Sequence, residues 1–266
     1  MTAWEKGVKY AAMGFAIFLA VAIIGSIVTA VGFILGLSGI DGVEDEITVY
    51  QVSETVTALE LEVKAASVEI KVGESFSVES NLKHLRVKVK DGCLLVEETE
   101  SFGAIYHGAK LVLYVPADAV LERAEISTGA GRLTVEKITA EKLELDLGAG
   151  EVILERVKAT KSCEIDGGAG AVTVKDSAFR DLTMDMGVGQ LVMTAVLTGD
   201  CDMDMGVGET RLTLQGDKES YRVKINKGVG SAKVDGSYAS DGETFGDGEN
   251  RVTINGGVGA VDVEFE

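Results

Sequence analysis

Regular alternation of apolar and polar residues runs through most of the second half of the chain. It is clearest in three runs that approach a glycine: LELDL before Gly148, LTMDM before Gly187 and CDMDM before Gly206. Further alternating runs follow such glycines, among them EVILERV from Glu151 and AVTVKDS from Ala171. A period of two is typical of a strand with one buried face. The pattern therefore predicts a series of β-strands joined by glycine-rich corners.

These corners repeat at a regular interval. A Gly-[Ala/Val]-Gly triplet begins at Gly129, Gly148, Gly168, Gly187, Gly206, Gly228 and Gly257, at intervals of 19, 20, 19, 19, 22 and 29 residues. Aligning the repeats on their triplets gives three apolar columns: Leu143, Cys163, Leu182, Cys201, Val223 and Val252; Leu145, Ile165, Met184, Met203, Ile225 and Ile254; Leu154, Val174, Met193, Leu212, Val234 and Val263. Repeats of this length with inward columns predict a solenoid. Since parallel crossovers are overwhelmingly right-handed, the expected fold is an all-β, right-handed parallel β-helix of about 19-residue coils over residues 125–266.

The preceding stretch, residues 56–124, is less regular and is expected to form the N-terminal cap and first coils. ALELEVKAASVEIKV resembles one coil, with Ala65-Ala66-Ser67 in place of the glycine triplet. LRVKVKDGCLLVEE predicts a hairpin around Asp91-Gly92, and KLVLYVPADA a strand that ends at Pro116. Near the other end, residues 235–250 form a glycine- and acid-rich excursion that lengthens the last interval.

The N-terminal region has a different pattern. Residues 10–40 contain no charged side chain over 31 positions, which is long enough for a tilted transmembrane helix. Lys6 and Lys9 precede this segment and acidic residues follow it, so the positive-inside rule places residues 1–9 in the cytoplasm and the rest outside the cell, with residues 41–55 as a linker. A cleavable signal peptide ending at Ala30 is the alternative, although the apolar run continues beyond that position.

Composition and charge argue against nucleic-acid binding and against global disorder. The 266 residues include 33 Gly and one Pro, and the formal net charge is −18. Nucleic-acid binding needs clustered Lys and Arg, so a nucleic-acid partner is not expected. The apolar fraction of 46% supplies a real core and argues against global disorder.

The order of these pieces resembles one known family. The opening LELEVKAASVEIKVG, the junction YVPADAVLERAEISTGAG, the repeated LDLGAGEVIL-type coil and the closing NRVTINGGVGAVDVEF are similar to the bacterial putative-adhesin family of β-strand-repeat proteins (domain of unknown function 4097). The resemblance covers roughly residues 50–266. It implies a β-solenoid on the bacterial cell surface, often behind one membrane anchor, and it implies no catalytic residues.

The main candidate site is the column two positions before each triplet. It reads Asp146, Asp166, Asp185, Asp204, Asn226 and Asn255, and alternation points these side chains outward. Three interpretations stay open for the four aspartates: hydrogen bonds that support the glycine corners, a hard cation such as Ca²⁺ bridging stacked carboxylates, and paired carboxylates acting on a sugar polymer.

Other chemistry is sparse in the sequence. Cys163 and Cys201 share an inward column two coils apart, about 10 Å, which is beyond disulfide reach. With Cys93 they are expected to be inert thiols. Neither His84 nor His107 lies beside a nucleophile motif. No catalytic residue and no cofactor is therefore expected.

Three classes of function remain. The first is a non-enzymatic cell-surface protein, an adhesin or an extracellular binding or scaffold protein on a single-pass anchor, with a protein, peptide or polysaccharide partner. The second is an envelope-stress or regulatory accessory that senses cationic peptides through its acidic ectodomain. Because only residues 1–9 would face the cytoplasm, it would need a membrane partner protein. The third is a carbohydrate-active β-helix enzyme.

Overall fold

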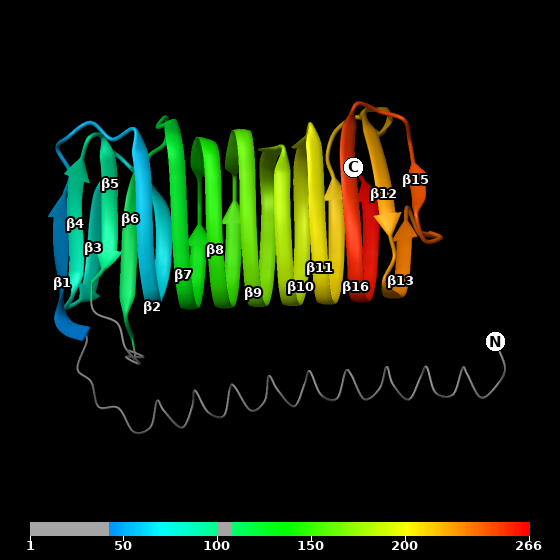
Figure 1. The fold of residues 1–266 in the computed structure, drawn as a ribbon. Helices are drawn as coiled ribbons and strands as arrows, with labels where there is room; N and C mark the ends of the chain where they lie inside the picture. The colour runs from blue at the N-terminus through cyan, green and yellow to red at the C-terminus, as the bar shows by residue number, and fades with distance from the viewer. Residues whose placement is uncertain (1–42, 100–107) are drawn as a thin grey trace, which may run out of the picture. The chain divides into compact units, whose positions relative to one another are not determined.

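The fold consists almost entirely of β-strands stacked along one direction. The computed structural model describes residues 43–99 and 108–266, in which sixteen strands form one hydrogen-bonded sheet (Figure 1). The strands are β1 (Val43–Gln51), β2 (Ala58–Gly73), β3 (Ser77–Leu82), β4 (Leu85–Lys90), β5 (Cys93–Glu98), β6 (Lys110–Pro116), β7 (Leu121–Val135), β8 (Ile138–Glu155), β9 (Val157–Arg180), β10 (Leu182–Thr198), β11 (Asp200–Leu214), β12 (Tyr221–Asn226), β13 (Val229–Val234), β14 (Ser237–Tyr238), β15 (Glu243–Phe245) and β16 (Asn250–Phe265), with a 3₁₀ turn η1 (Lys218–Ser220) before β12.

The repeated unit is a coil with two sides joined at the glycine triplet. Each long strand follows one side, bends at the triplet and returns along the other, and β7 to β11 pair in parallel with their sequence neighbours. We call the part before the triplet the first side and the part after it the second side. The register aligns Gly148-Ala149-Gly150 with the triplets on β7 and β9. The predicted parallel solenoid with coils about 19 residues apart is therefore confirmed, while its right-handed winding stays a prediction.

The three predicted apolar columns form the core. All eighteen of their side chains are at most 4% exposed. Met184 and Met203 lie opposite each other on adjacent strands, and both are fully buried. The alternation of apolar and polar residues therefore predicted the inward-facing side chains correctly in all six aligned repeats.

The glycine corners are required by the close stacking of the coils. The third residue of each triplet, which is its second glycine, adopts a positive φ, +151° at Gly208, which residues with a side chain rarely adopt. A Cβ atom added at Gly208 would also overlap the carbonyl oxygen of Gly189 in the next coil. The triplet therefore allows backbone to lie directly on backbone.

The N-terminal end departs from chain order. β2 lies between β7 and a coil formed by β5 and β6, so the first coil in sequence is not the first in space (Figure 1). The predicted hairpin around Asp91-Gly92 is confirmed as β4–β5, and the strand ending at Pro116 as β6. The expected corner Ala65-Ala66-Ser67 was off by one position, because Ala65 aligns with Ala130 and Ala66 with Gly131.

β1 and β3 complete this end of the solenoid. β3 pairs antiparallel with β6, and β1 pairs antiparallel with β3. Residues 43–51, which were expected to belong to a linker over 41–55, therefore form the outermost strand of the second side.

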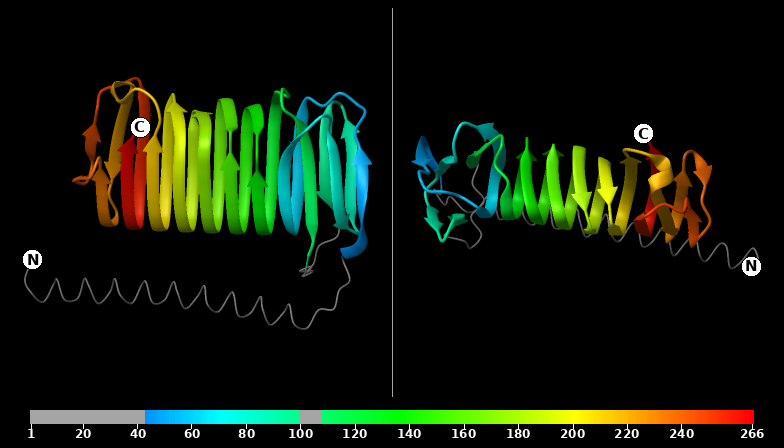
Figure 2. Two further views of the ribbon diagram at one scale, coloured as in Figure 1. Left: turned by 180° about the vertical axis from the view of Figure 1, so that it is seen from behind. Right: turned by 90° about the horizontal axis from the view of Figure 1, so that it is seen from above.

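The C-terminal end also departs from chain order. β16 lies between β11 and β12, and on the second side it pairs with β13 (Figure 2). The columns therefore run from Met203 to Ile254 and then to Ile225, whereas chain order had predicted Ile225 before Ile254. The excursion over residues 235–250 contributes β14 and β15, which pair antiparallel with β13 and β12 and cap this end.

The predicted transmembrane segment, residues 10–40, and the cytoplasmic residues 1–9 lie outside the described residues. Across the part of the chain that the structure does describe, no helix has the length and apolar character needed to span a bilayer.

Candidate acidic binding face

The predicted aspartate column is present on the first side of the solenoid. The register places Asp146, Asp166, Asp185 and Asp204 directly opposite one another on β8 to β11. All four side chains are exposed, because each alternates with buried residues of the core columns. Adjacent strands are about 4.8 Å apart, so the carboxylates form a ladder with that spacing.

A second acidic column runs beside the first, two residues earlier on each strand. It contains Glu125, Glu144, Glu164 and Asp202, with Thr183 on β10. Sequence reasoning missed this column, although the same alternation in LELDL and CDMDM contains it. We call the two columns together the acidic face: Glu125, Glu144, Asp146, Glu164, Asp166, Asp185, Asp202 and Asp204.

An open groove of about 620 Å³ follows the edge of the acidic face. The four aspartates and Asn255 line it together with glycines of the corners and with Leu147, Met186 and Met205. The first glycine of each triplet lines the groove, which continues over five coils. Its shape suits an extended segment better than a compact ligand.

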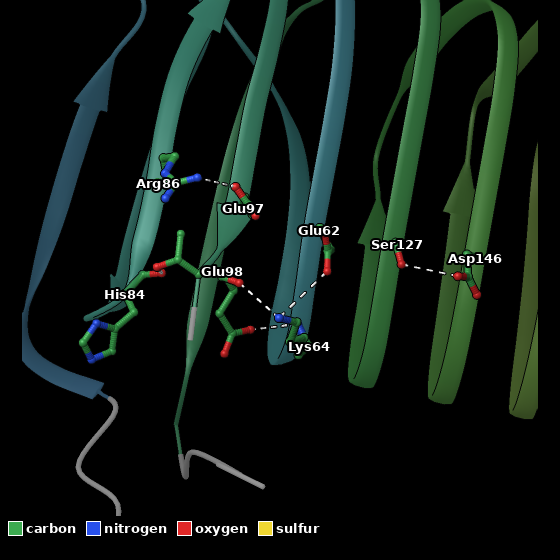
Figure 3. A network of polar contacts seen from close by, with 9 residues as sticks. Glu62, Lys64, His84, Arg86, Glu97, Glu98, Ser127 and Asp146 are labelled. Carbon is green, nitrogen blue, oxygen red and sulfur yellow. Dashed lines mark hydrogen bonds and ion pairs between the residues drawn. The ribbon is translucent and has the colours of Figure 1, made fainter. Parts of the chain in front are cut away.

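The ends of the aspartate column are capped by neutral partners. At the N-terminal end the Ser127 hydroxyl donates to Asp146 at 3.5 Å, as Figure 3 shows. At the other end Asn255 follows Asp204 in the register. Its amide donates to Asp202 at 3.0 Å and accepts a hydrogen bond from Asn226 at 2.6 Å.

The N-terminal end of the solenoid neutralises its acidic groups in a different way. Lys64 lies 3.9 Å from Glu62, and Arg86 pairs with Glu97 at 3.0 Å (Figure 3). Glu98 is nearly fully buried, and its carboxylate accepts a hydrogen bond from the backbone nitrogen of Lys64 at 2.7 Å. Carboxylates at this end therefore have partners that the middle of the acidic face lacks.

The pKa values of two carboxyl groups in the middle of the acidic face are shifted. Partial desolvation and then the charges of Asp204 and Asp166 raise the pKa of the Asp185 carboxyl. Partial desolvation, followed by the charges of Glu125 and Glu164, also raises the pKa of Glu144. Both shifts favour the protonated form, and the repulsion of stacked like charges contributes to each.

Elsewhere the solenoid pairs opposite charges between neighbouring coils. Arg132 contacts Glu151 at 2.7 Å, and Lys161 contacts Glu141 at 2.7 Å. Arg156–Glu136, at 3.1 Å, is a third pair of this kind. None of the four stacked aspartates forms an ion pair with a described residue. Ion pairs between neighbouring coils thus neutralise carboxylates elsewhere on the solenoid, but not at the aspartate column.

Two interpretations of the aspartates, a cation site and hydrogen bonds that support the glycine corners, can be compared with this geometry. Within residues 43–99 and 108–266, no three carboxylate, thiol or imidazole groups gather closely enough to hold a metal ion. No hydrogen bond described for Asp166, Asp185 or Asp204 reaches the backbone of a glycine corner. The geometry is that of an open charged surface.

The cysteines lie apart from this face. Cys163 and Cys201 are free and buried, as expected, and Cys93 is free and half-buried. Burial raises the pKa of all three thiols, to about 11 for Cys201. Since the thiolate is the nucleophile, Cys163 and Cys201 are poor candidates for covalent chemistry.

The two-sided stack agrees with the comparison with known families. The sequence model of the Toastrack family, DUF4097, matches residues 46–249. The chain belongs to the Toastrack family. This confirms the resemblance inferred from the opening, junction, coil and closing motifs. No curated protein matches the chain significantly.

Several solved structures resemble this Toastrack chain at low sequence identity. They include a putative cell adhesion protein from Clostridium sporogenes (14% identity, 83% of this chain and 99% of that one, TM-score 0.39) and a putative adhesin from Bacteroides fragilis (14%, 83% and 98%, 0.45). A third is a putative lipid binding protein from Parabacteroides distasonis (13%, 82% and 96%, 0.44). These likenesses are too distant to carry an argument about function.

Proposed function

We propose that this Toastrack chain is a non-enzymatic cell-surface binding protein whose acidic face holds a positively charged partner outside the cell. The observation that carries the proposal is the contrast between paired and unpaired charge. Ion pairs join neighbouring coils at Arg132–Glu151 and Lys161–Glu141, whereas the aspartate column has no cationic partner among the described residues. Complementary charge on a partner would remove the repulsion within the face and speed the encounter.

The groove favours a cationic peptide or protein segment as the partner. It follows the aspartate column over five coils and combines carboxylates with the apolar side chains of Met186 and Met205. An extended chain with Lys or Arg side chains fits both features, because those side chains combine a charged head with an apolar stem. An adhesin or scaffold would hold such a segment on a partner protein.

The second candidate function, an envelope-stress accessory that senses cationic peptides, is favoured by the same groove. It differs in its consequence inside the cell. With only residues 1–9 in the cytoplasm, the signal would have to pass through another membrane protein. Co-purification of a membrane partner that changes on adding cationic peptide would separate sensing from adhesion.

The location belongs to the same proposal. Residues 10–40 would form the membrane anchor, residues 1–9 would be cytoplasmic, and the solenoid would be extracellular. Protease added to intact cells should then remove the solenoid and leave a small membrane-bound fragment. A mature protein that begins at Val31 would instead establish a cleaved signal peptide.

The test of binding uses cells that display the full chain. One variant carries Asn at Asp146, Asp166, Asp185 and Asp204. A control variant carries Gln at Glu54, Glu74, Glu219 and Glu249, which are exposed and lie off the acidic face. Both variants remove four negative charges, so they have the same net charge.

Binding of a fluorescent Lys-rich peptide should fall at least about fourfold for the aspartate variant, since each of the four charge contacts contributes roughly 0.2–1 kcal/mol. The control should bind nearly as well as the wild type. Equal losses in both variants would mean that only net charge matters. Turnover of a uronate polymer by the wild-type chain would refute a non-enzymatic role.

A further inference from the structure

The N-terminal end of the solenoid carries a strip of positive charge. β4 is the outermost strand of the first side, since it pairs with β5 and with no other strand of the described chain (Figure 1). Alternation along β4 points Arg86, Lys88 and Lys90 away from the core, and all three are exposed. We call these three side chains the basic strip. They lie together on one strand of a chain whose formal net charge is −18.

Two members of the basic strip lack an acidic partner. Arg86 lies opposite Glu97 and forms an ion pair with it at 3.0 Å. Lys88 lies opposite the apolar Leu95. Neither Lys88 nor Lys90 forms an ion pair with a residue that the structure describes. Their ammonium groups are therefore available to an anionic partner.

The chain enters the solenoid beside the basic strip. Val43, the first residue of β1, lies opposite Leu82 at the end of β3, and the turn at residues 83–84 leads from there into β4. The uncharged segment over residues 10–40 ends three residues before Val43. Three residues reach about 10 Å when extended. An anchor over residues 10–40 would therefore hold the end of the solenoid that contains β1 and β4 close to the lipid headgroups.

The length of the uncharged segment supports this placement. A helix of 31 residues is about 46 Å long, and a bilayer with its headgroups is about 40–45 Å thick. Such a helix ends at the level of the headgroups and leaves little additional chain for a longer tether.

Charge and reach distinguish the orientations open to an anchored solenoid. Contact through the first side would bring the acidic face to the headgroups, and anionic headgroups repel it. Contact through the second side would turn the basic strip away from them. The opposite end also has exposed cations, Arg222 and Lys224 on β12. They lie nine strand steps from β4, about 43 Å, which is beyond the reach of the short connection.

Distance separates the acidic face from the headgroups when the N-terminal end meets the membrane. Asp146 on β8, the first of the four aspartates, lies four strand steps from β4, about 19 Å. The Debye length in physiological salt is about 8 Å. Headgroups in contact with β4 therefore have little effect on the aspartate column.

We propose that the solenoid contacts the membrane with its N-terminal end, where Lys88 and Lys90 bind anionic lipid headgroups. The negative surface potential of anionic lipids attracts each of these lysines. The exposed Glu44 and Glu46 of the same end lie on β1, in the second side, so the contact is made through β4. This inference rests on the proposed location, since it takes residues 10–40 as the anchor. It leaves the acidic face directed away from the bilayer.

Lysine footprinting of the full chain in vesicles tests the contact. The chain is reconstituted in phosphatidylcholine vesicles with or without phosphatidylglycerol and treated with a membrane-impermeant amine reagent. Mass spectrometry then gives the reactivity of each lysine. Lys158 on β9 and Lys224 on β12 are exposed and serve as internal controls. Lys224 also reports contact through the opposite end.

The expected result is protection that depends on lipid charge. With phosphatidylglycerol, the reactivity of Lys88 and Lys90 relative to Lys158 should fall about fivefold, the factor that corresponds to the attraction of one lysine to an anionic surface. High salt should restore the reactivity. Equal reactivity in both kinds of vesicle, or protection of Lys224 in place of Lys88 and Lys90, would overturn the proposal.

Flotation of the same vesicles separates this inference from the proposed location. A chain that does not float with phosphatidylcholine vesicles would refute the anchor. The phosphatidylglycerol vesicles then decide the contact alone, since protection of Lys88 and Lys90 over Lys224 supports it and equal reactivity of the three lysines overturns it.

A pair of charge-matched variants tests which lysines make the contact. In the wild type, Lys83 in the adjoining turn is exposed and should share the protection by phosphatidylglycerol. The variant Lys88→Gln, Lys90→Gln should lose the protection of Lys83, whereas the control Lys158→Gln, Lys224→Gln should keep it. The same protection of Lys83 in both variants would overturn the role of β4.

Discussion

The double variant Asp185→Asn, Asp204→Asn tests whether the aspartate column costs stability. It removes two neighbouring repulsions, Asp166–Asp185 and Asp185–Asp204, while it preserves shape and an acceptor oxygen. At the strand spacing of about 4.8 Å, each pair repels by about 0.9 kcal/mol in water, and physiological salt roughly halves that value. The variant should therefore be more stable than the wild type by about 1 kcal/mol, or roughly 2–4 °C in melting temperature.

The pH dependence gives a second readout of the same repulsion. The pKa of Asp185 is raised in the fold, whereas the unfolded chain leaves it near ~3.9. The folded state then binds more protons between these two values, so this group stabilises the fold as pH falls from neutral through its folded pKa. The gain is complete below the unfolded pKa. The difference in stability between variant and wild type should accordingly shrink on acidification.

Thermal melts at pH 7 and pH 4.5, each at low and high salt, measure both effects. Glu54→Gln with Glu74→Gln provides the control, since it removes two exposed charges off the acidic face. A double aspartate variant that is less stable than the wild type by more than about 1 kcal/mol would refute the reasoning, because it would show that the carboxylates accept essential hydrogen bonds.

Three further predictions concern the core and the corners. Met203→Asn should lower the free energy of unfolding by at least about 3 kcal/mol, since it buries an unpartnered amide. Thr183→Asn on the same sheet should lower it by less than about 1 kcal/mol. Similar denaturant midpoints for the two variants would contradict the register. Gly208→Ala should cost more than about 4 kcal/mol because it forces two coils apart, whereas Gly236→Ala, also at positive φ but in open space, should cost about 1–2 kcal/mol; calorimetry of both variants checks this. The Cys201 thiol, with its pKa raised to about 11, should resist alkylation at pH 7.5 until the protein unfolds, and rapid labelling in the native state would show that it is accessible.

Much of this architecture could be predicted from the sequence because the repeat is strict. Glycine triplets set the coil length, and alternation identified which residues point inward in each coil. The same alternation placed Asp146 and Asp185 on the outer surface. The second acidic column could also have been predicted, since Glu144 and Asp202 lie two residues before members of the first.

The order of the coils at the two ends could not be predicted in the same way. Ile225 and Ile254 both suit the position beside Met203, because each repeat offers the same kind of side chain to its neighbour. Chain order and the observed order therefore satisfy the same columns. What distinguishes them is a small set of contacts between distant positions. One example is Asn250, whose side chain accepts a hydrogen bond from the Gly199 backbone nitrogen at 3.1 Å, whereas β12 has Tyr221 at the equivalent position. No periodic pattern predicts such a contact.

The out-of-order coils at both ends have a consequence for how this chain can change in length. Each end has an out-of-order strand, β2 at one end and β16 at the other, and each terminates in an antiparallel strand, β1 or β15, so a further parallel coil does not simply continue the stack there. Between β7 and β11 the coils are interchangeable, and duplicating one would extend the molecule by about 4.8 Å. A duplicated coil of the β9 type would also bring one more residue to each acidic column. Tandem duplication of a segment of about 19 residues would thus lengthen the charged surface in fixed increments while the ends stay unchanged.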